Sequence, residues 1–279
     1  MPELPEVETV RRGLMPVLLG RRLVSVSAHR PDLRFPLPAD FARRLTGRRV
    51  ESIERRAKFL LVGLEDRLTL IAHLGMSGHF QLATADTPLR THDHVCFATD
   101  EGASVRFNDA RRFGFMDLVA TEMLADHPLL AALGPEPLGD EFTGSYLARR
   151  LSGRIAALKA ALMDQRIVAG MGNIYASESL YRARLSPQRP AGTVGASASR
   201  RLVDAIRAVL SEAIAAGGSS LRNHQRPSGE LGCFQHTFAV YDRAGAPCPD
   251  CRCDAARTGG IRRTVIAGRA TFYCPKRQR

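Results

Sequence analysis

The chain opens with the stretch Met1-Pro2-Glu3-Leu4-Pro5-Glu6-Val7-Glu8-Thr9-Val10. From Pro5 onward this stretch predicts a helix, because proline suits the first helical turn and the glutamates favour its positive end. Val7, Val10 and Leu14 repeat at helical spacing and predict the buried face of that helix. The helix leaves the two residues between Met1 and Leu4 without a structural explanation.

Those two residues suit covalent chemistry. Removal of Met1 leaves Pro2 with a secondary amine, and an α-amino group has a pKa of about 8, against about 10.4 for lysine. More of it is therefore unprotonated near neutral pH, and it can attack an aldehyde carbon to give a cationic iminium. Glu3 stands beside it as a candidate acid or base. The alternative is that Pro2 and Glu3 only precede the helix and have no chemical role.

Composition narrows the class of protein. The chain has 279 residues, 44% of them hydrophobic, which is enough for two domains of ordinary size. Its 40 Lys and Arg against 28 Asp and Glu give a net charge of +12, which favours a polyanionic partner. No apolar run approaches the roughly 18 residues of a membrane span, and the charged start is not a secretory signal. We therefore expect a soluble, cytoplasmic protein.

The first half of the chain has the pattern of an antiparallel sandwich, with short extended runs separated by Gly, Asp and Pro turns. The expected strands are Leu23–Ala28, Val50–Ile53, Lys58–Leu64, Leu68–Leu74, His79–Leu82, Val95–Thr99, Ser104–Phe107 and Phe115–Val119. One short helix is expected within Pro38–Leu45. From His127 onward the apolar residues recur at helical spacing, and Gly217-Gly218 predicts the end of the last helix.

Two glycine-containing turns carry apolar, aromatic and charged side chains. They are His73-Leu74-Gly75-Met76-Ser77-Gly78, which exposes Met76, and Asn108-Asp109-Ala110-Arg111-Arg112-Phe113-Gly114, which offers two cations and an aromatic ring. Methionine is more often a core residue, so a packing role for Met76 stays open.

A second block lies in the helical half, within residues 163–178. Gly170 and Gly172 predict a tight crossing between helices, and Asn173 begins a helix whose amide groups could bind a phosphate. A Gly-x-Gly sequence alone is usually only a turn. The later segment 219–238, which contains Arg222-Asn223-His224, predicts a mobile loop over a site.

The cysteines are concentrated at the end of the chain. Four of the six lie within the last 32 residues, and they are Cys248, Cys251, Cys253 and Cys274. In a chain without a leader sequence such a cluster favours a metal over disulfides.

Pro2 to Thr9 resembles the amino terminus of the formamidopyrimidine-DNA glycosylase family, and similar segments recur along nearly the whole chain. The resemblance implies an α+β multidomain fold. Its expected parts are an N-terminal catalytic β-sandwich domain with flanking helices at 1–133, a helix–two-turn–helix DNA-binding domain with a lesion-covering loop at 134–238, and a β-hairpin zinc finger at 239–279.

The resemblance also implies a function. It predicts a base-excision repair enzyme that is both a DNA N-glycosylase and an abasic-site lyase, with β,δ-elimination. The expected substrates are oxidised purines such as 8-oxoguanine and formamidopyrimidines in double-stranded DNA. It predicts one zinc ion per chain, no membrane partner and a monomer.

Site residues follow from the same resemblance. The expected catalytic residues are Pro2, Glu3, Lys58 and Arg269. Of these, Lys58 is expected to contact a phosphate and transfer protons, and Arg269 to bind a phosphate. Without the resemblance, Lys58 would be assigned to a solvated strand edge and Arg269 to a hairpin surface. Those expected to contact DNA are Met76, His92, Arg111, Phe113, Arg154, Lys159, Asn173 and Tyr241. A metal site around Thr91-His92-Asp93-His94 is the weaker alternative.

Two features depart from the family pattern. Ala110 stands where the family usually has proline, and Arg277 stands where it has the fourth zinc ligand. A guanidinium carries only donors and cannot bind a metal. We therefore expect zinc on Cys248, Cys251, Cys253 and Cys274, although Cys251 and Cys253 are awkwardly close in sequence. A metal-free finger that stands on the packing of its apolar residues is the competing hypothesis.

Two rival functions remain open at this stage. One is the sister enzyme for oxidised pyrimidines, against which Leu4, the segment Val7-Glu8-Thr9 and the Gly229–Gly232 loop argue. The other is a non-catalytic protein that bends DNA with a wedge. It would need the basic surface and Phe113, but not a free prolyl amine.

Overall fold

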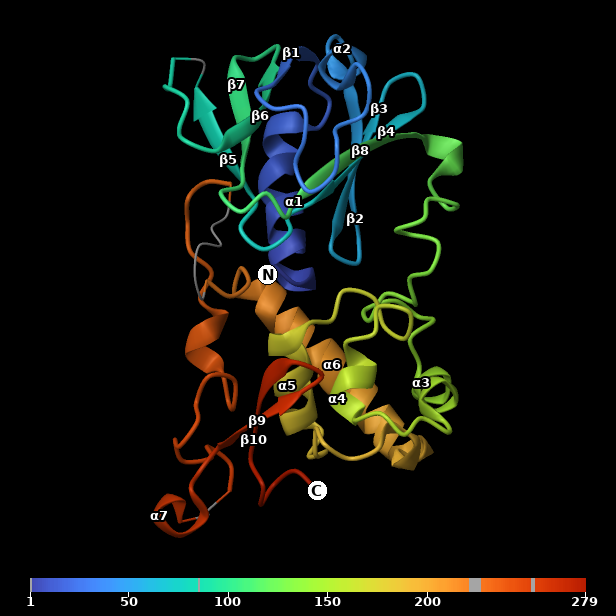
Figure 1. Ribbon diagram of the computed structural model, residues 1–279, viewed down its shortest axis with the longest axis vertical. Coiled ribbons are helices and arrows are strands. Elements are labelled where there is room, and N and C mark those ends of the chain that lie inside the picture. Colours follow the sequence, from blue (N-terminus) through green and yellow to red (C-terminus); the bar gives the residue numbers. More distant parts are fainter. Residues whose placement is uncertain (1, 85, 221–226, 252–253) are drawn as a thin grey trace. The chain divides into compact units, whose positions relative to one another are not determined.

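Figure 1 shows a computed structural model that describes residues 2–84, 86–220, 227–251 and 254–279. The chain forms two compact units. The first contains Met1–Ala131 with Ile214–Gln235, and the second contains Ala132–Ala213 with His236–Arg279. No helix among the described residues is long and apolar enough to cross a membrane.

The first unit begins with helix α1, Leu4–Leu18, with proline in its first turn as the sequence predicts. The backbone N–H of Glu3 donates to Glu6 Oε2 at 2.8 Å, which satisfies a donor at the start of the helix. Val7, Val10 and Leu14 are buried in the core of this unit. The predicted helix and its buried face are confirmed.

Two antiparallel sheets follow, and their apolar faces share that core. One has the order β1-β6-β7-β5, built from β1 Leu23–Ala28, β6 Asp93–Thr99, β7 Ala103–Asn108 and β5 His79–Thr84. The other has the order β2-β3-β4-β8, built from β2 Val50–Arg56, β3 Phe59–Leu64, β4 Leu68–His73 and β8 Phe115–Ala120. Figure 1 shows α1 beside these sheets. The predicted sandwich is confirmed.

Short elements complete the first unit. Helix α2, Phe41–Leu45, lies within the predicted range and packs its two apolar ends into the core. A 3-10 turn, η1 Thr121–Met123, follows β8.

The second unit is mainly helical. It contains α3 Gly144–Leu151, α4 Leu158–Leu162, α5 Asn173–Arg182, η2 Ala191–Thr193 and most of α6 Ala196–Ala215. After α6 the backbone of Gly217 and Gly218 is left-handed, with φ of +77° and +79°, which ends the helix at the predicted place. The chain then passes η3 Phe234–Thr237 and α7 Ala255–Thr258.

The chain ends in a hairpin of β9 Arg262–Ile266 and β10 Arg269–Tyr273. Ile266 pairs with Arg269, so the turn consists of two residues, Ala267 and Gly268, with φ of +47° and +72°. Two positive φ angles match the twist of a tight hairpin. The predicted C-terminal hairpin is therefore present, and Phe272 anchors it in a small apolar cluster with Val240 and Ile261.

Candidate functional site

The start of the chain is buried and hydrogen-bonded within the first unit. Pro2 is buried and Glu3 is only 3% exposed. Glu6 ties this start to the segment after α6, because its Oε2 accepts from the Glu3 N–H and its Oε1 accepts from the Ser219 N–H, both at 2.8 Å. Gly218 makes the approach possible, since an added Cβ would lie 3.0 Å from Glu6 Oε1. Sequence patterns alone did not predict this link.

Lys58 lies in the turn between β2 and β3, where Arg56 pairs with Phe59. Its neighbour Ala57 has a left-handed φ of +54°, and Lys58 itself is buried rather than solvated. Its charge acts on His73 at the end of β4. Burial, followed by the charges of Lys58 and Arg34, lowers the pKa of His73 to about 4. His73 is therefore neutral near pH 7.

The two turns with predicted duplex-facing side chains do expose them. Met76 is 39% exposed and Phe113 is 41% exposed, so both side chains reach the surface of the first unit. The guanidinium carbon of Arg111 lies 4.7 Å from the centre of the Phe113 ring, in cation–π geometry. These three side chains offer an apolar surface flanked by a cation.

His92 is exposed, with a left-handed φ of +75°, and its ring lies 5.9 Å from that of His94. The His94 Nε2 is bonded to the Asp109 carbonyl at 2.9 Å. Among the described residues, the one group of three or more His, Cys, Asp or Glu that could hold a metal is elsewhere. The alternative of a metal at His92 to His94 gains no support.

In the second unit, α4 and α5 are joined by a turn that one side chain organises. Gln165 Nε2 donates to the carbonyls of Met163 and Met171, at 3.1 and 2.8 Å, and its Oε1 accepts from the Gly170 N–H at 2.9 Å. Gly170 has a φ of +82°, whereas Gly172 is extended. Asn173 is the first residue of α5, as predicted.

The C-terminal hairpin is fastened to these helices within the second unit. Asn173 Nδ2 donates to the Ala270 carbonyl at 3.0 Å and lies 3.4 Å from the Tyr241 hydroxyl. Lys159 Nζ donates to the Ala270 carbonyl at 3.2 Å and to Thr271 Oγ1 at 2.9 Å. Arg269, the residue before this anchor, is exposed at the end of the hairpin turn.

Lys159 is thus placed differently from the expectation of a phosphate contact. It is 0% exposed, and its ammonium bonds to β10, so in this structure it offers no surface to a phosphate. Arg154, by contrast, is half-buried, and its Nε donates to the Arg150 carbonyl.

The segment that contains Tyr241 is held by a carboxylate that sequence reasoning did not single out. Glu178 of α5 is almost fully buried and accepts the backbone N–H groups of Ala239, Val240 and Tyr241, at 2.9, 3.0 and 2.8 Å. Burial raises the pKa of Glu178, while the three N–H donors work in the opposite direction.

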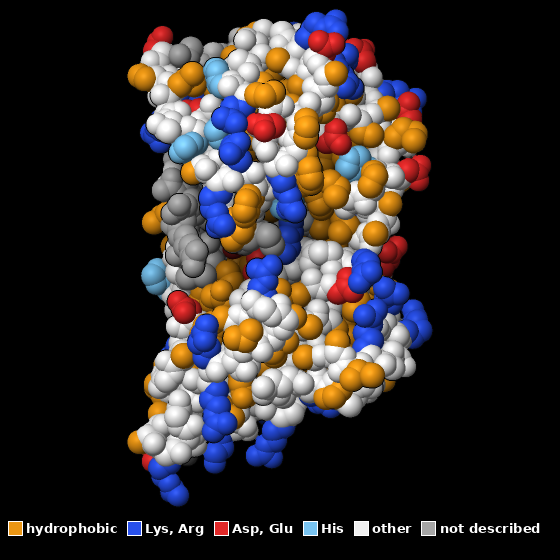
Figure 2. Space-filling view, viewed as in Figure 1, with side chains coloured by type: hydrophobic (Ala, Val, Ile, Leu, Met, Phe, Trp, Pro, Cys, Tyr) orange, Lys and Arg blue, Asp and Glu red, His pale blue; other side chains and the backbone are white. Residues whose placement is uncertain are grey.

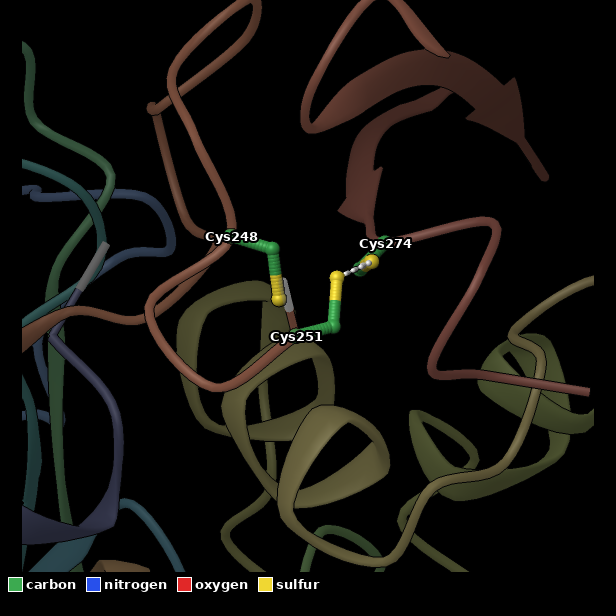
Figure 3. A group of neighbouring side chains, drawn as sticks. All are labelled: Cys248, Cys251 and Cys274. Atoms are coloured by element: carbon green, nitrogen blue, oxygen red, sulfur yellow. Dashed lines mark hydrogen bonds between the residues drawn. The ribbon is translucent and has the colours of Figure 1, made fainter. Parts of the chain in front are cut away.

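Three of the four predicted metal ligands come together in the second unit. The sulfur atoms of Cys248, Cys251 and Cys274 lie within 4.8 Å of one another, and those of Cys251 and Cys274 are 3.5 Å apart. Figure 3 shows the three side chains converging from one loop and from the end of β10. Four thiolates around one zinc at ~2.3 Å would be separated by about 3.8 Å, so these three fit a shared ion.

Arg277, which occupies the position of the usual fourth ligand, makes other contacts. Its Nη2 pairs with Asp250 at 2.8 Å and its guanidinium lies 4.9 Å from the Tyr181 ring centre. The Tyr181 hydroxyl is 3.2 Å from Cys248 Sγ. Burial raises the pKa of the Cys248 thiol, but this hydroxyl and two backbone N–H groups outweigh it and lower the pKa to about 7. Cys253 and Arg222-Asn223-His224 lie outside the described residues.

A basic chain that has an exposed aromatic ring beside an arginine in one unit, and two helices joined by a tight turn and a hairpin with exposed arginines in the other, has the features of a nucleic-acid-binding protein. The comparisons with known proteins narrow this class. The formamidopyrimidine-DNA glycosylase N-terminal domain matches residues 1–116, and the H2TH domain of the same enzymes matches residues 133–225.

Individual relatives and solved structures are similar to the chain over nearly its whole length and belong to the same family as the matched domains. A formamidopyrimidine-DNA glycosylase of Rhodospirillum rubrum is 57% identical over 281 residues, covering all of both chains. The crystal structure of the MutM (Fpg) protein from Thermus thermophilus is 42% identical, with a TM-score of 0.87 over 99% of this chain and 98% of that one. A variant Lactococcus lactis Fpg bound to Fapy-dG-containing DNA is 33% identical, with a TM-score of 0.90 over the whole of both chains.

The chain therefore belongs to the formamidopyrimidine-DNA glycosylase family. It is a base-excision DNA repair enzyme, a glycosylase and abasic-site lyase that removes oxidised purines from DNA.

Proposed function

We propose that the amine of Pro2, freed by loss of Met1, is the nucleophile of this enzyme, and that Glu3 is its acid. The observation that carries this proposal is the fixed start of the chain. Pro2 and Glu3 are buried, and Glu6 holds the Glu3 backbone through a 2.8 Å hydrogen bond. A nucleophile needs a defined position more than it needs exposure before substrate arrives.

Base loss and strand cutting share one covalent intermediate in this proposal. The Pro2 nitrogen bonds to C1′ of the damaged nucleotide as the bond from C1′ to the base breaks, and the base leaves with the proton that the amine gives up. Glu3 gives a proton to the sugar ring oxygen, the ring opens, and the nitrogen and C1′ form an iminium. The iminium makes the C2′ hydrogen acidic, so its loss expels the 3′ phosphate. A second elimination expels the 5′ phosphate.

Two cations are assigned to the phosphates. Lys58 is buried in the β2–β3 turn, and Arg269 is exposed at the tip of an anchored hairpin. A fixed positive charge stabilises the leaving phosphate as its negative charge develops. We assign Lys159 to the support of the hairpin, because its ammonium bonds to Ala270 and Thr271.

DNA contacts are assigned to exposed and half-buried side chains. Met76, Arg111 and Phe113 fill the space left by the extruded nucleotide, which accounts for their exposure. His92, Arg154, Asn173 and Tyr241 contact the backbone, where contacts position the protein without reading sequence. In this assignment residues 1–133 carry the chemistry, 134–238 bind the duplex and cover the lesion, and 239–279 form the finger.

Zinc is assigned to the cysteine cluster, with Cys248, Cys251, Cys253 and Cys274 as its ligands. Three of these sulfurs are already close enough to share an ion, and thiolate is the ligand that structural zinc prefers. When bound, the ion would hold the loop before the hairpin to the segment after it, a structural rather than a chemical role.

A separation of the two activities tests the assignment of Glu3. Glu3→Gln should remove base excision from a duplex with 8-oxoguanine while strand cutting at a preformed abasic site persists, because the aldehyde already exists there. Both rates are measured under single-turnover conditions, with Glu51→Gln, on an exposed strand position, as the matched control. Equal loss of both activities in Glu3→Gln would contradict the assignment.

A further inference from the structure

Asp109 is a buried and extensively bonded residue of the first unit that the proposed chemistry leaves unused. It is 0% exposed. Its carboxyl Oδ1 accepts from the Ser77 hydroxyl at 2.5 Å and its Oδ2 accepts from the Gly114 N–H at 2.7 Å. Its backbone N–H donates to the His92 carbonyl at 3.1 Å, and its carbonyl accepts from His94.

These bonds join the two turns that carry the exposed side chains. Ser77 follows Met76, and Gly114 follows Phe113. The Ser77 hydroxyl has a second role, since its oxygen accepts the Arg111 N–H at 3.1 Å. One hydroxyl and one carboxyl therefore link the Met76 turn to both ends of the turn that bears Arg111 and Phe113.

The two turns also meet backbone to backbone. Gly75 has a φ of +64°, and a Cβ placed on it would lie 2.2 Å from the Phe113 carbonyl carbon and 2.3 Å from the Gly114 nitrogen. Only glycine allows this approach. The Gly75 N–H is in turn held by His73 Nδ1 at 3.0 Å.

We propose that Asp109 and Ser77 are positioning residues that lock the two turns into one body, so that Met76, Arg111 and Phe113 enter the duplex together. The proposal rests on the proposed wedge function of those three side chains. Side chains that must displace a stacked base act best on a rigid backbone. Such a backbone is already ordered in the free protein, so less conformational entropy is lost when DNA binds.

The turn that bears Arg111 and Phe113 has a backbone that such hydrogen bonds would stabilise. Residue 110 is alanine, so the turn lacks the fixed φ that a proline would supply at that position. Arg112 adopts a left-handed φ of +56°, which is unfavourable for a side chain of its size. Side-chain bonds from Asp109 and Ser77 hold the backbone in that shape.

The test removes the hydroxyl and restores it. Ser77→Ala deletes both of its bonds, whereas Ser77→Thr keeps an oxygen at the same place. Single-turnover excision of 8-oxoguanine from duplex DNA is compared with cutting of a single-stranded abasic oligonucleotide, which needs no wedge. We expect Ser77→Ala to slow duplex excision about tenfold or more, as follows from loss of one or two hydrogen bonds. Ser77→Thr should keep most of the rate.

A fluorescent 2-aminopurine beside the lesion reports unstacking directly, and its stopped-flow signal should slow in step with excision in Ser77→Ala. Single-strand cutting should be unchanged, which also shows that the variant folds. If Ser77→Ala keeps the duplex rate, or if single-strand cutting falls equally, the proposal is overturned. Should Ser77→Ala fail to fold, Asp109→Asn takes its place, with the same expectation and the same contrary outcomes.

A double variant separates this proposal from the wedge function on which it rests. If Ser77 acts through the wedge, the rate losses of Ser77→Ala and Phe113→Ala combine to less than their product. A product of independent losses overturns the positioning role while the wedge stands. Full activity of Phe113→Ala alone removes the wedge function itself.

Discussion

His73 shows how the fold fixes the chemical state of one residue. Its Nδ1 accepts the Gly75 N–H, and its ring stacks on Phe115 with the planes 13° apart. Burial and the nearby charges of Lys58 and Arg34 lower its pKa to about 4. Protonation would turn the accepting nitrogen into a donor and break the bond to Gly75. The neutral ring therefore holds the turn that bears Met76.

This shift predicts how stability depends on pH. The unfolded His73 takes up a proton near its ordinary pKa of 6.5, whereas the folded one does so only near 4. Its contribution is therefore fully present above about pH 6.5 and is lost as pH falls toward 4, by up to about 3 kcal/mol. Urea unfolding at pH 7.5 and 4.5 should show a smaller pH-dependent loss in His73→Asn than in the wild type. An equal loss in both would contradict the lowered pKa, and His29→Asn, at an exposed site, serves as the control.

Sequence reasoning at this scale singled out side chains by their chemistry and missed those that act by position. Pro2 and Glu3 follow from the reactive groups at the start of the chain, and Arg111 and Phe113 follow from the resemblance to the family. Asp109, Ser77, Glu178 and Glu6 depend on partners up to 213 residues away. A single sequence does not show such partners, and the same limit hides the burial of Lys159.

Among the elements, the β-strands are predicted well by the pattern of apolar and polar residues, but the residues at which they end are predicted less well. Leu23–Ala28 has the predicted bounds, whereas β2 continues to Arg56, three residues beyond the prediction. Arg55 and Arg56 resemble loop residues in sequence, yet they pair with Leu60 and Phe59 across the hairpin. Backbone pairing with a strong neighbour outweighs their weak strand preference.

The turn that bears Arg111 and Phe113 leads to a prediction about duplex excision. Phe113→Ala should slow excision from a duplex more than it weakens binding, because the backbone contacts proposed for the second unit remain. Excision under single-turnover conditions is compared with affinity for a duplex bearing a non-cleavable abasic analogue. Met123→Ala removes another exposed apolar side chain of the same unit and should change neither. Binding that falls in step with excision would mean that Phe113 supports the fold instead.

The base of the hairpin predicts a metal content. Protein purified without chelator should carry about one zinc ion per chain by elemental analysis, since three close thiols favour a closed four-ligand site. Cys251→Ser should lose the metal, whereas Cys233→Ser, at an exposed cysteine that is not a member of the cluster, should keep it. A wild-type content near zero with DNA cutting intact would favour the metal-free finger, with Arg277 and Asp250 joining the two segments.

For the molecule as a whole, the net charge and the distribution of the proposed site residues over the two units agree with the repair function. Lys and Arg side chains outnumber Asp and Glu on the face in Figure 2, in keeping with the net charge of +12. Such a surface gives salt-dependent attraction to any DNA. The proposed amine, acid and wedge belong to the first unit, and the hairpin arginine belongs to the second. Composition predicted the polyanionic partner, but only the motifs distinguished repair from mere binding.

The assignment of Pro2 is the central claim, and reductive trapping tests it most directly. The protein is incubated with duplex DNA that holds an abasic site, and sodium borohydride reduces the iminium to a stable amine. After digestion, mass spectrometry should place the adduct on the peptide that begins at Pro2, and undamaged duplex should give no adduct. Lys58→Arg should still be trapped at the same peptide. An adduct on Lys58, or on any residue other than Pro2, would contradict the account.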